Sequence, residues 1–203
     1  MSISRLPKET AKLITSEFDN CPLDEVRDAS EIARRALALF GVAGLGLGAL
    51  HNDINSWLKE EDLWDELSPS ELAYVSENEP TEKQSIDATW KSEALIVLLW
   101  SLEKMEYLPA ITEQCDTSIF QELLPPYANL SSAEFIASAK RRPDDILIKM
   151  ADELMGYHWQ ARDARIHSKP THLDIEIIQE RHHAINWVIG YDGAPWDEVT
   201  TDT

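Results

Sequence analysis

Hydrophobic side chains recur along most of the chain at steps of three and four residues, which places them on one face of an α-helix. Sustained alternation of apolar and polar residues, the pattern of a β-strand, is absent from the sequence. The pattern therefore predicts an all-α fold. We expect a single helical domain over residues 1–203, with about 7–9 helices around a central apolar one.

The most apolar segment lies in the middle of the chain. Residues 81–106 contain no glycine or proline, and Thr81 with Gln84 has the spacing of a capping box. Residues 94–100 are apolar on every side of a helix, which is typical of a helix surrounded by others. We expect the central helix to span residues 81–106.

Caps and prolines place several other helices. Ser68 with Glu71 and Ser131 with Glu134 form further capping-box patterns. Pro143 opens a long segment with a regular apolar stripe. The stripe consists of Leu147, Met150, Leu154, Tyr157, Ala161 and Ala164.

The two ends of the chain are expected to differ. Residues 1–26 include a short amphipathic helix at residues 7–18, which we expect to be peripheral. A last helix is predicted over residues 174–189, ended by Gly190, and residues 190–203 form a tail that is expected to pack on the domain.

A helix beginning near Val26 precedes a glycine-rich segment. Its charged side chains, including Arg34 and Arg35, are expected to point away from the core. Its apolar stripe consists of Val26, Ala29, Ala33, Ala36 and Phe40.

The glycine-rich segment matches a dinucleotide-binding fingerprint at Gly44, Gly46 and Ala49. That fingerprint functions only between a strand and a helix, whereas a helix precedes it here. The glycines therefore indicate a helix end or close helix packing, and no cofactor is expected.

The chain is strongly acidic, with 37 acidic and 18 basic residues and a net charge of −19. Phosphate groups would be repelled, so nucleic acid and anionic membrane surfaces are not expected as partners, and the negative charge favours either cationic partners or simply solubility. Residues 53–87 hold eleven acidic and two basic residues. The residues predicted to bind a basic partner are Glu60, Glu61, Asp62, Asp65, Glu66 and Glu71.

Neither export nor membrane insertion is indicated. The N-terminus has no apolar signal segment, and the longest apolar run is far shorter than the roughly 20 residues of a membrane span. Cys21 and Cys115 do not form a CxxC pair. We expect a cytoplasmic protein with reduced thiols.

One charged residue falls on an apolar stripe. Helical spacing directs Arg181 inward beside the isoleucines of the last helix, where an unpaired charge would be costly. Its candidate partners are Glu93, Asp152 and Asp202. A buried ion pair that fixes packing is favoured over a catalytic or ligand-binding arginine.

A polar pocket between the last two helices is the alternative. It would be lined by His158, Arg162, Glu180 and Arg181. Glu180 and His183 form one ExxH motif, but a di-metal bundle needs two, so no metal site is expected. No motif supplies a catalytic nucleophile, and an enzyme is not favoured.

Several motifs together resemble a known family. They include Arg34-Arg35, the last-helix segment Glu180-Arg181-His182-His183-Ala184-Ile185-Asn186-Trp187 and the terminal Trp196-Asp197-Glu198-Val199. The chain resembles the bacterial domain-of-unknown-function family 4272 from about Arg27 onward. The resemblance implies a bacterial, helical, cytoplasmic protein and carries no catalytic residues.

Two functions are compatible with these features. The first is a protein-binding module, such as an immunity or inhibitor protein that neutralises a basic toxin by electrostatic steering. The second is a small-molecule sensor or enzyme that uses the polar pocket. The oligomeric state stays open.

Overall fold

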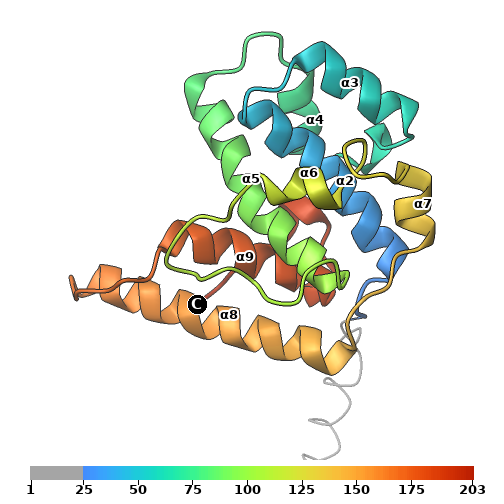
Figure 1. The fold of residues 1–203 in the computed structure, drawn as a ribbon. Coiled ribbons are helices and arrows are strands. Elements are labelled where there is room, and N and C mark those ends of the chain that lie inside the picture. The colour runs from blue at the N-terminus through green and yellow to red at the C-terminus, as the bar shows by residue number, and fades with distance from the viewer. Residues whose placement is uncertain (1–24) are drawn as a thin grey trace, which may run out of the picture.

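The computed structural model describes residues 25–203, and all regular secondary structure within this range is helical (Figure 1). The expected helix at residues 7–18 lies outside the described residues. The all-α prediction is confirmed. The α-helices are α2 (Ala29–Gly46), α3 (His51–Glu60), α4 (Pro69–Ser76), α5 (Glu82–Ser101), α6 (Ile119–Leu123), α7 (Ser132–Ala137), α8 (Asp144–Ile166) and α9 (Ile175–Val188), and the 3-10 helices are η1 (Trp64–Glu66), η2 (Tyr191–Gly193) and η3 (Trp196–Glu198).

Helix α5 lies at the centre of the molecule, between α2 and α9, and α8 packs on α9 along the base (Figure 1). Every side chain of residues 94–100 is at most 5% exposed. The predicted central apolar helix is therefore present.

Helix α5 ends five residues earlier than predicted, at Ser101. Glu103 adopts a left-handed conformation with φ 58°, its N–H donates to the Trp100 carbonyl, and the Lys104 N–H donates to the Leu99 carbonyl. These two bonds form a Schellman motif, which usually uses glycine at the left-handed position. The glutamate there gave no sequence signal for the helix end.

The glycine-rich segment lets α2 approach α5 closely. A Cβ atom at Gly46 would lie 2.7 Å from the backbone nitrogen of Thr89 and 2.8 Å from the carbonyl carbon of Ala88. Helix α2 runs through this segment to Gly46. Gly46 thus serves close helix packing and also lies at the end of α2, the two roles that the sequence indicated.

The three predicted capping boxes are all present, at the N-termini of α4, α5 and α7. In each box the Ser or Thr side chain accepts a hydrogen bond from the third residue of the helix, whose own side chain accepts one from the cap. Local sequence therefore specifies where these helices begin.

The stripe of α8 packs on α9 as its spacing predicts. Leu147, Leu154, Ala161 and Ala164 are buried, while the remaining two stripe residues are half-buried. No helix among residues 25–203 is long and apolar enough to cross a membrane.

The segment after α9 folds back onto the helices. Trp196 and Val199 are buried in the main core. At the turn, Gly190 has φ 74°, and a Cβ atom there would lie 2.2 Å from the Glu25 carbonyl oxygen. Only glycine fits this close contact between the two ends of the described chain.

Candidate functional site

The arginine on the apolar stripe of the last helix is fully buried and paired. Arg181 on α9 donates from Nε to Glu93 Oε2 at 2.8 Å, and its Nη2 lies 2.7 Å from the same oxygen. Its Nη1 donates to the carbonyl oxygen of Pro109 at 2.6 Å. Of the three predicted partners, Glu93 is the one that Arg181 contacts, because Asp152 and Asp202 are exposed.

The other oxygen of Glu93 holds the loop that follows α5. Glu93 Oε1 accepts from the backbone N–H of Cys115 at 2.7 Å. Burial, reinforced by the charge of Glu93, raises the pKa of the Cys115 thiol to about 12. The thiol is therefore protonated at neutral pH and does not provide a nucleophile.

The residues expected to line a polar pocket bind separate partners. Arg162 is exposed and donates from Nη1 to the carbonyl oxygen of Thr203. Glu180 accepts from Lys91 Nζ at 2.9 Å through both carboxylate oxygens. His158, Glu180, Arg162 and Arg181 thus do not converge on one shared ligand position.

His158 instead faces His182 across the contact between α8 and α9. Their Nδ1 atoms lie 3.1 Å apart, so one ring donates a hydrogen bond to the other. Burial lowers the pKa of both rings, to about 4 for His182, where the neighbouring His158 adds to the effect. Both rings are therefore neutral at pH 7.

A second buried ion pair corrects two expectations. Arg35 is 4% exposed and donates from Nη2 to Glu71 Oε2 at 2.5 Å and from Nη1 to the Glu66 carbonyl oxygen at 2.8 Å. Arg35 was expected to point outward, and Glu71 was expected on a binding surface. Arg35 lies inside because residues 36–39, which follow it on α2, are buried on all sides, and Glu71 lies inside as its ion-pair partner. That apolar run was the signal available in the sequence.

A cleft of about 360 Å³ adjoins this pair. Arg35 stacks over Trp196 at 4.6 Å and Arg27 over Trp187 at 4.3 Å, and the two indole rings lie 5.4 Å apart. These residues come from the two ends of the described chain and from α2 and α9. The cleft could not be predicted from the sequence, because it depends on contacts between distant segments.

The cleft region does not form a catalytic triad. Asp197 accepts from the backbone N–H of Ser70 at 2.9 Å and from its hydroxyl at 2.8 Å, and so caps α4. The nearby His183 donates from Nε2 to the carbonyl oxygen of Trp196 at 2.9 Å, not to a serine. In residues 25–203 no group of three or more metal-binding side chains is positioned to hold an ion.

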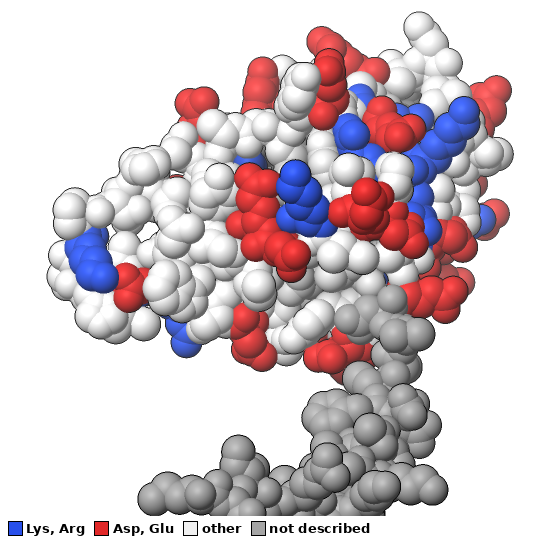
Figure 2. Space-filling view, turned by 90° about the horizontal axis from the view of Figure 1, so that it is seen from below, with Lys and Arg blue, Asp and Glu red and all other residues white. Residues whose placement is uncertain are grey.

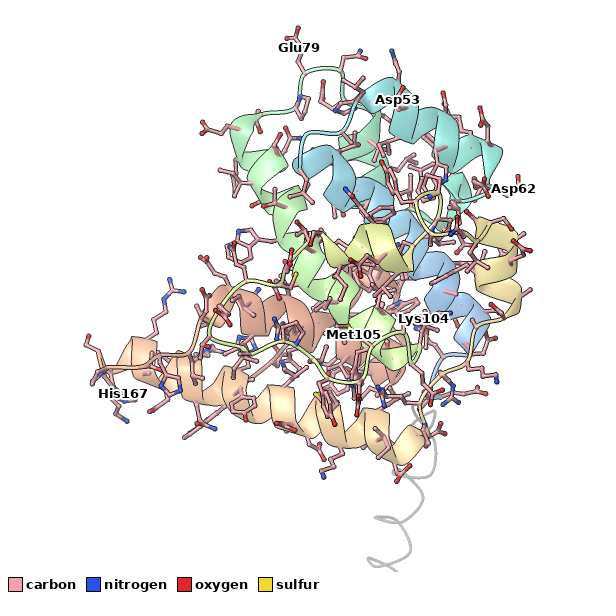
Figure 3. The ribbon with its side chains drawn as sticks, in the orientation of Figure 1. Asp53, Asp62, Glu79, Lys104, Met105 and His167 are labelled. Atoms are coloured by element: carbon pink, nitrogen blue, oxygen red, sulfur yellow. The ribbon has the colours of Figure 1, made fainter. Side chains whose placement is uncertain are left out.

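The acidic residues from α3 to η1 form an exposed surface, which we call the acidic loop and define as residues 60–66. Glu60, Asp62 and Asp65 are exposed, Glu61 is partly exposed, and none of the four makes an ion pair with another described residue. Glu66 lies 3.6 Å from Arg34 and is partly neutralised. Figure 3 shows Asp53 and Asp62 at opposite ends of α3.

Three of these carboxylates oppose the dipole of α3. Glu60 is the last residue of α3, Glu61 is its C-cap, and Asp62 follows with φ 56°. A helix C-terminus carries partial negative charge, so acidic residues there reduce stability. The one basic residue of that turn, Lys59, stacks on Trp64 at 4.2 Å. On the face seen from below in Figure 2, Lys and Arg lie beside Asp and Glu.

Comparison with known proteins identifies a family. The family model described as "Domain of unknown function (DUF4272)" matches residues 8–199, which is almost the whole chain. The chain belongs to this family. No curated protein and no solved structure matches it.

The structure shows where the motifs lie by which the sequence resembles the DUF4272 family. Arg181 supplies the buried ion pair of α9, and Arg35, Trp187 and Trp196 border the cleft. Most of these residues stabilise contacts between helices and the C-terminal segment, and their charges are satisfied within the protein.

Proposed function

We propose that this member of the DUF4272 family is a protein-binding module that binds a basic protein through its acidic loop, residues 60–66. The observation that supports the proposal is the group of unpaired carboxylates at the C-terminus of α3, a position where they reduce stability. Binding sites often retain residues that are unfavourable for folding, because their interactions are completed by the partner.

The charges of the buried core do not favour an enzyme. The buried ion pairs Glu93–Arg181 and Glu71–Arg35 and the neutral pair His158–His182 are each engaged within the protein. The carboxylates of the acidic loop, in contrast, are exposed or partly exposed, and residues 60–66 contain no basic side chain. An immunity or inhibitor protein that neutralises a basic toxin is the class that this surface suits best, since charge complementarity accelerates association.

The test is affinity capture from lysate of the native cell at low and at high salt, followed by mass spectrometry. The binding variant is Glu60→Gln/Glu61→Gln/Asp62→Asn. The control is Glu113→Gln/Glu122→Gln/Asp152→Asn, which removes the same charge from exposed residues elsewhere.

We expect the wild type and the control to capture one basic protein that salt releases, since salt screens exposed charges beyond about 10 Å at 0.1 M. The binding variant should lose the partner and melt at a higher temperature than the wild type. Equal loss by both variants, or no capture at low salt, would refute the proposal.

A further inference from the structure

A second cavity lies between α2, α3 and the segment of residues 116–127, which includes α6. Its volume is about 540 Å³. Small-molecule sites commonly measure about 300–1,000 Å³. The cavity opens to solvent beside Leu47, which is 51% exposed, and Tyr127, which is 63% exposed. Its size and opening suit a small molecule better than a single side chain of a partner.

Aromatic rings form much of the wall of this cavity. Phe40 packs edge-on against the rings of Trp57, Phe120 and Tyr127, with centroids 6.1, 6.3 and 6.3 Å away. All four residues line the cavity. The face of an aromatic ring carries partial negative charge, so a wall of such rings attracts cations.

The charged groups of the lining have one sign. Asp53 and Asp116 line the cavity, and no Lys, Arg or His does so. The Asp53 carboxylate makes no hydrogen bond or ion pair with another described residue. Asp116 accepts from the Ser118 N–H at 2.9 Å, and the Ser118 hydrogen bonds lower its pKa. Two carboxylates without a counter-charge beside aromatic rings match an organic cation.

We propose that this cavity binds a small organic cation, namely an ammonium group carried on an apolar body. The aromatic wall and Leu47 would contact the apolar body, and Asp53 and Asp116 would offset the charge. A neutral molecule of the same shape would lack the attraction to the rings and the carboxylates. An anion would be repelled by them. This site is separate from the acidic loop and does not depend on the proposed protein partner.

The test uses calorimetric titration of the purified full chain with 2-phenylethylammonium. The comparison ligands are neutral 2-phenylethanol and anionic 3-phenylpropanoate. We expect the cation to bind at least about tenfold more tightly than the alcohol, and the anion not to bind. No binding of the cation at about 10 mM, or equal affinity for the alcohol, would overturn the proposal.

Paired variants assign the binding to this cavity. Asp53→Asn should weaken binding of the cation but not of the alcohol, whereas Asp152→Asn, which removes an exposed charge on α8 outside the cavity, should leave both unchanged. Tyr127→Leu should weaken cation binding, and Tyr127→Phe should preserve it because the ring is kept. Equal effects of the two Asp variants, or no effect of Tyr127→Leu, would overturn the assignment. Thermal unfolding of each variant checks that it is folded.

A further titration distinguishes binding of a free small molecule from binding of a lysine side chain of a partner protein. A Gly-Ser peptide with one central lysine carries the same ammonium group on a chain. Because the cavity is larger than one lysine side chain, we expect the peptide to bind more weakly than 2-phenylethylammonium. Tighter binding of the peptide would overturn the small-molecule proposal.

Discussion

Single residues in the interior show how this chain accommodates buried charge. Arg181 and Arg35 are both at most 4% exposed, and each pairs with a glutamate from another helix. A buried pair gains little net stability, but loss of one partner leaves an uncompensated charge. These pairs therefore specify which helices meet more than they add to the total stability.

Removing one side of the central pair should be far more harmful than removing both. We expect Glu93→Leu and Arg181→Met each to lower the free energy of unfolding by about 3–5 kcal/mol. The double variant should lose much less than the sum, because no unpaired charge remains. Urea denaturation of the three variants measures this difference. Additive losses would show that the two side chains are not coupled.

The histidine pair should make stability depend on pH. The pKa of His182 is about 4 in the folded chain and about 6.5 when unfolded, so below pH 6.5 the unfolded chain binds more protons. The His182 contribution is thus present above pH 6.5 and is lost as pH falls toward 4, by roughly 3 kcal/mol at most. Burial, together with the charge of Arg162, also lowers the pKa of His158.

The variant His182→Gln removes this titration. Compared with the wild type, its free energy of unfolding should decline less between pH 6.5 and pH 4, because carboxylates that titrate in this range affect both proteins equally. Denaturant unfolding across the range provides the measurement. The same slope in both proteins would contradict a neutral buried His182.

Single helices follow their local sequence closely at the N-terminus and less closely at the C-terminus. Three capping boxes mark helix starts as predicted, because each is complete within four residues. Helix α5 ends at Ser101, and the left-handed residue that follows is Glu103, a residue type that does not usually indicate a helix end. The end is formed by the hydrogen bonds from the Glu103 and Lys104 N–H groups to the last carbonyls of the helix.

Substitution of two helical glycines by alanine should change the stability of the protein in opposite directions. At Gly46 the new methyl group would meet the backbone of α5, so Gly46→Ala should lower stability by about 1–3 kcal/mol. At Gly156 in α8 a Cβ atom has nothing within 4 Å, so Gly156→Ala should raise stability by about 0.5–1 kcal/mol. Melting temperatures of the two variants test the close contact of α2 with α5, which predicts opposite shifts.

The whole molecule is closed by contacts between distant parts of the chain. Arg27 donates from its backbone N–H to the Val188 carbonyl at 2.9 Å, from Nε to the Trp187 carbonyl at 2.8 Å and from Nη2 to the Ala194 carbonyl at 2.8 Å. It also pairs with Glu31 through Nη1. One side chain thus joins the start of α2 to the end of α9 and the C-terminal segment.

Arg27→Lys keeps the charge but cannot reach these acceptors together, because an ammonium group lacks the planar fork of a guanidinium. We expect it to lower the free energy of unfolding by about 2 kcal/mol, the order of one or two lost charged hydrogen bonds. Denaturant unfolding tests this. Arg165→Lys, an exposed substitution of the same kind, should have little effect. Equal stability of Arg27→Lys and the wild type would show that the guanidinium contacts are dispensable.

The sequence alone was sufficient for the helical class, the central apolar helix, the capped helix starts and the family. These depend on residues close in the chain, through the spacing of apolar positions and short capping motifs. Periodicity also showed that Arg181 faces inward, and Glu93 was one of its candidate partners.

Tertiary structure alone decided which side chains meet. Arg181 pairs with Glu93 and not with Asp152 or Asp202. Glu71 lies in a buried ion pair and not on the expected surface. The residues of the predicted polar pocket bind separate partners. The cavity lined by aromatic rings likewise forms only when α3 is placed beside α2 and α6. Local spacing defines the direction of a side chain from its own helix, whereas its partner depends on how that helix packs against the others.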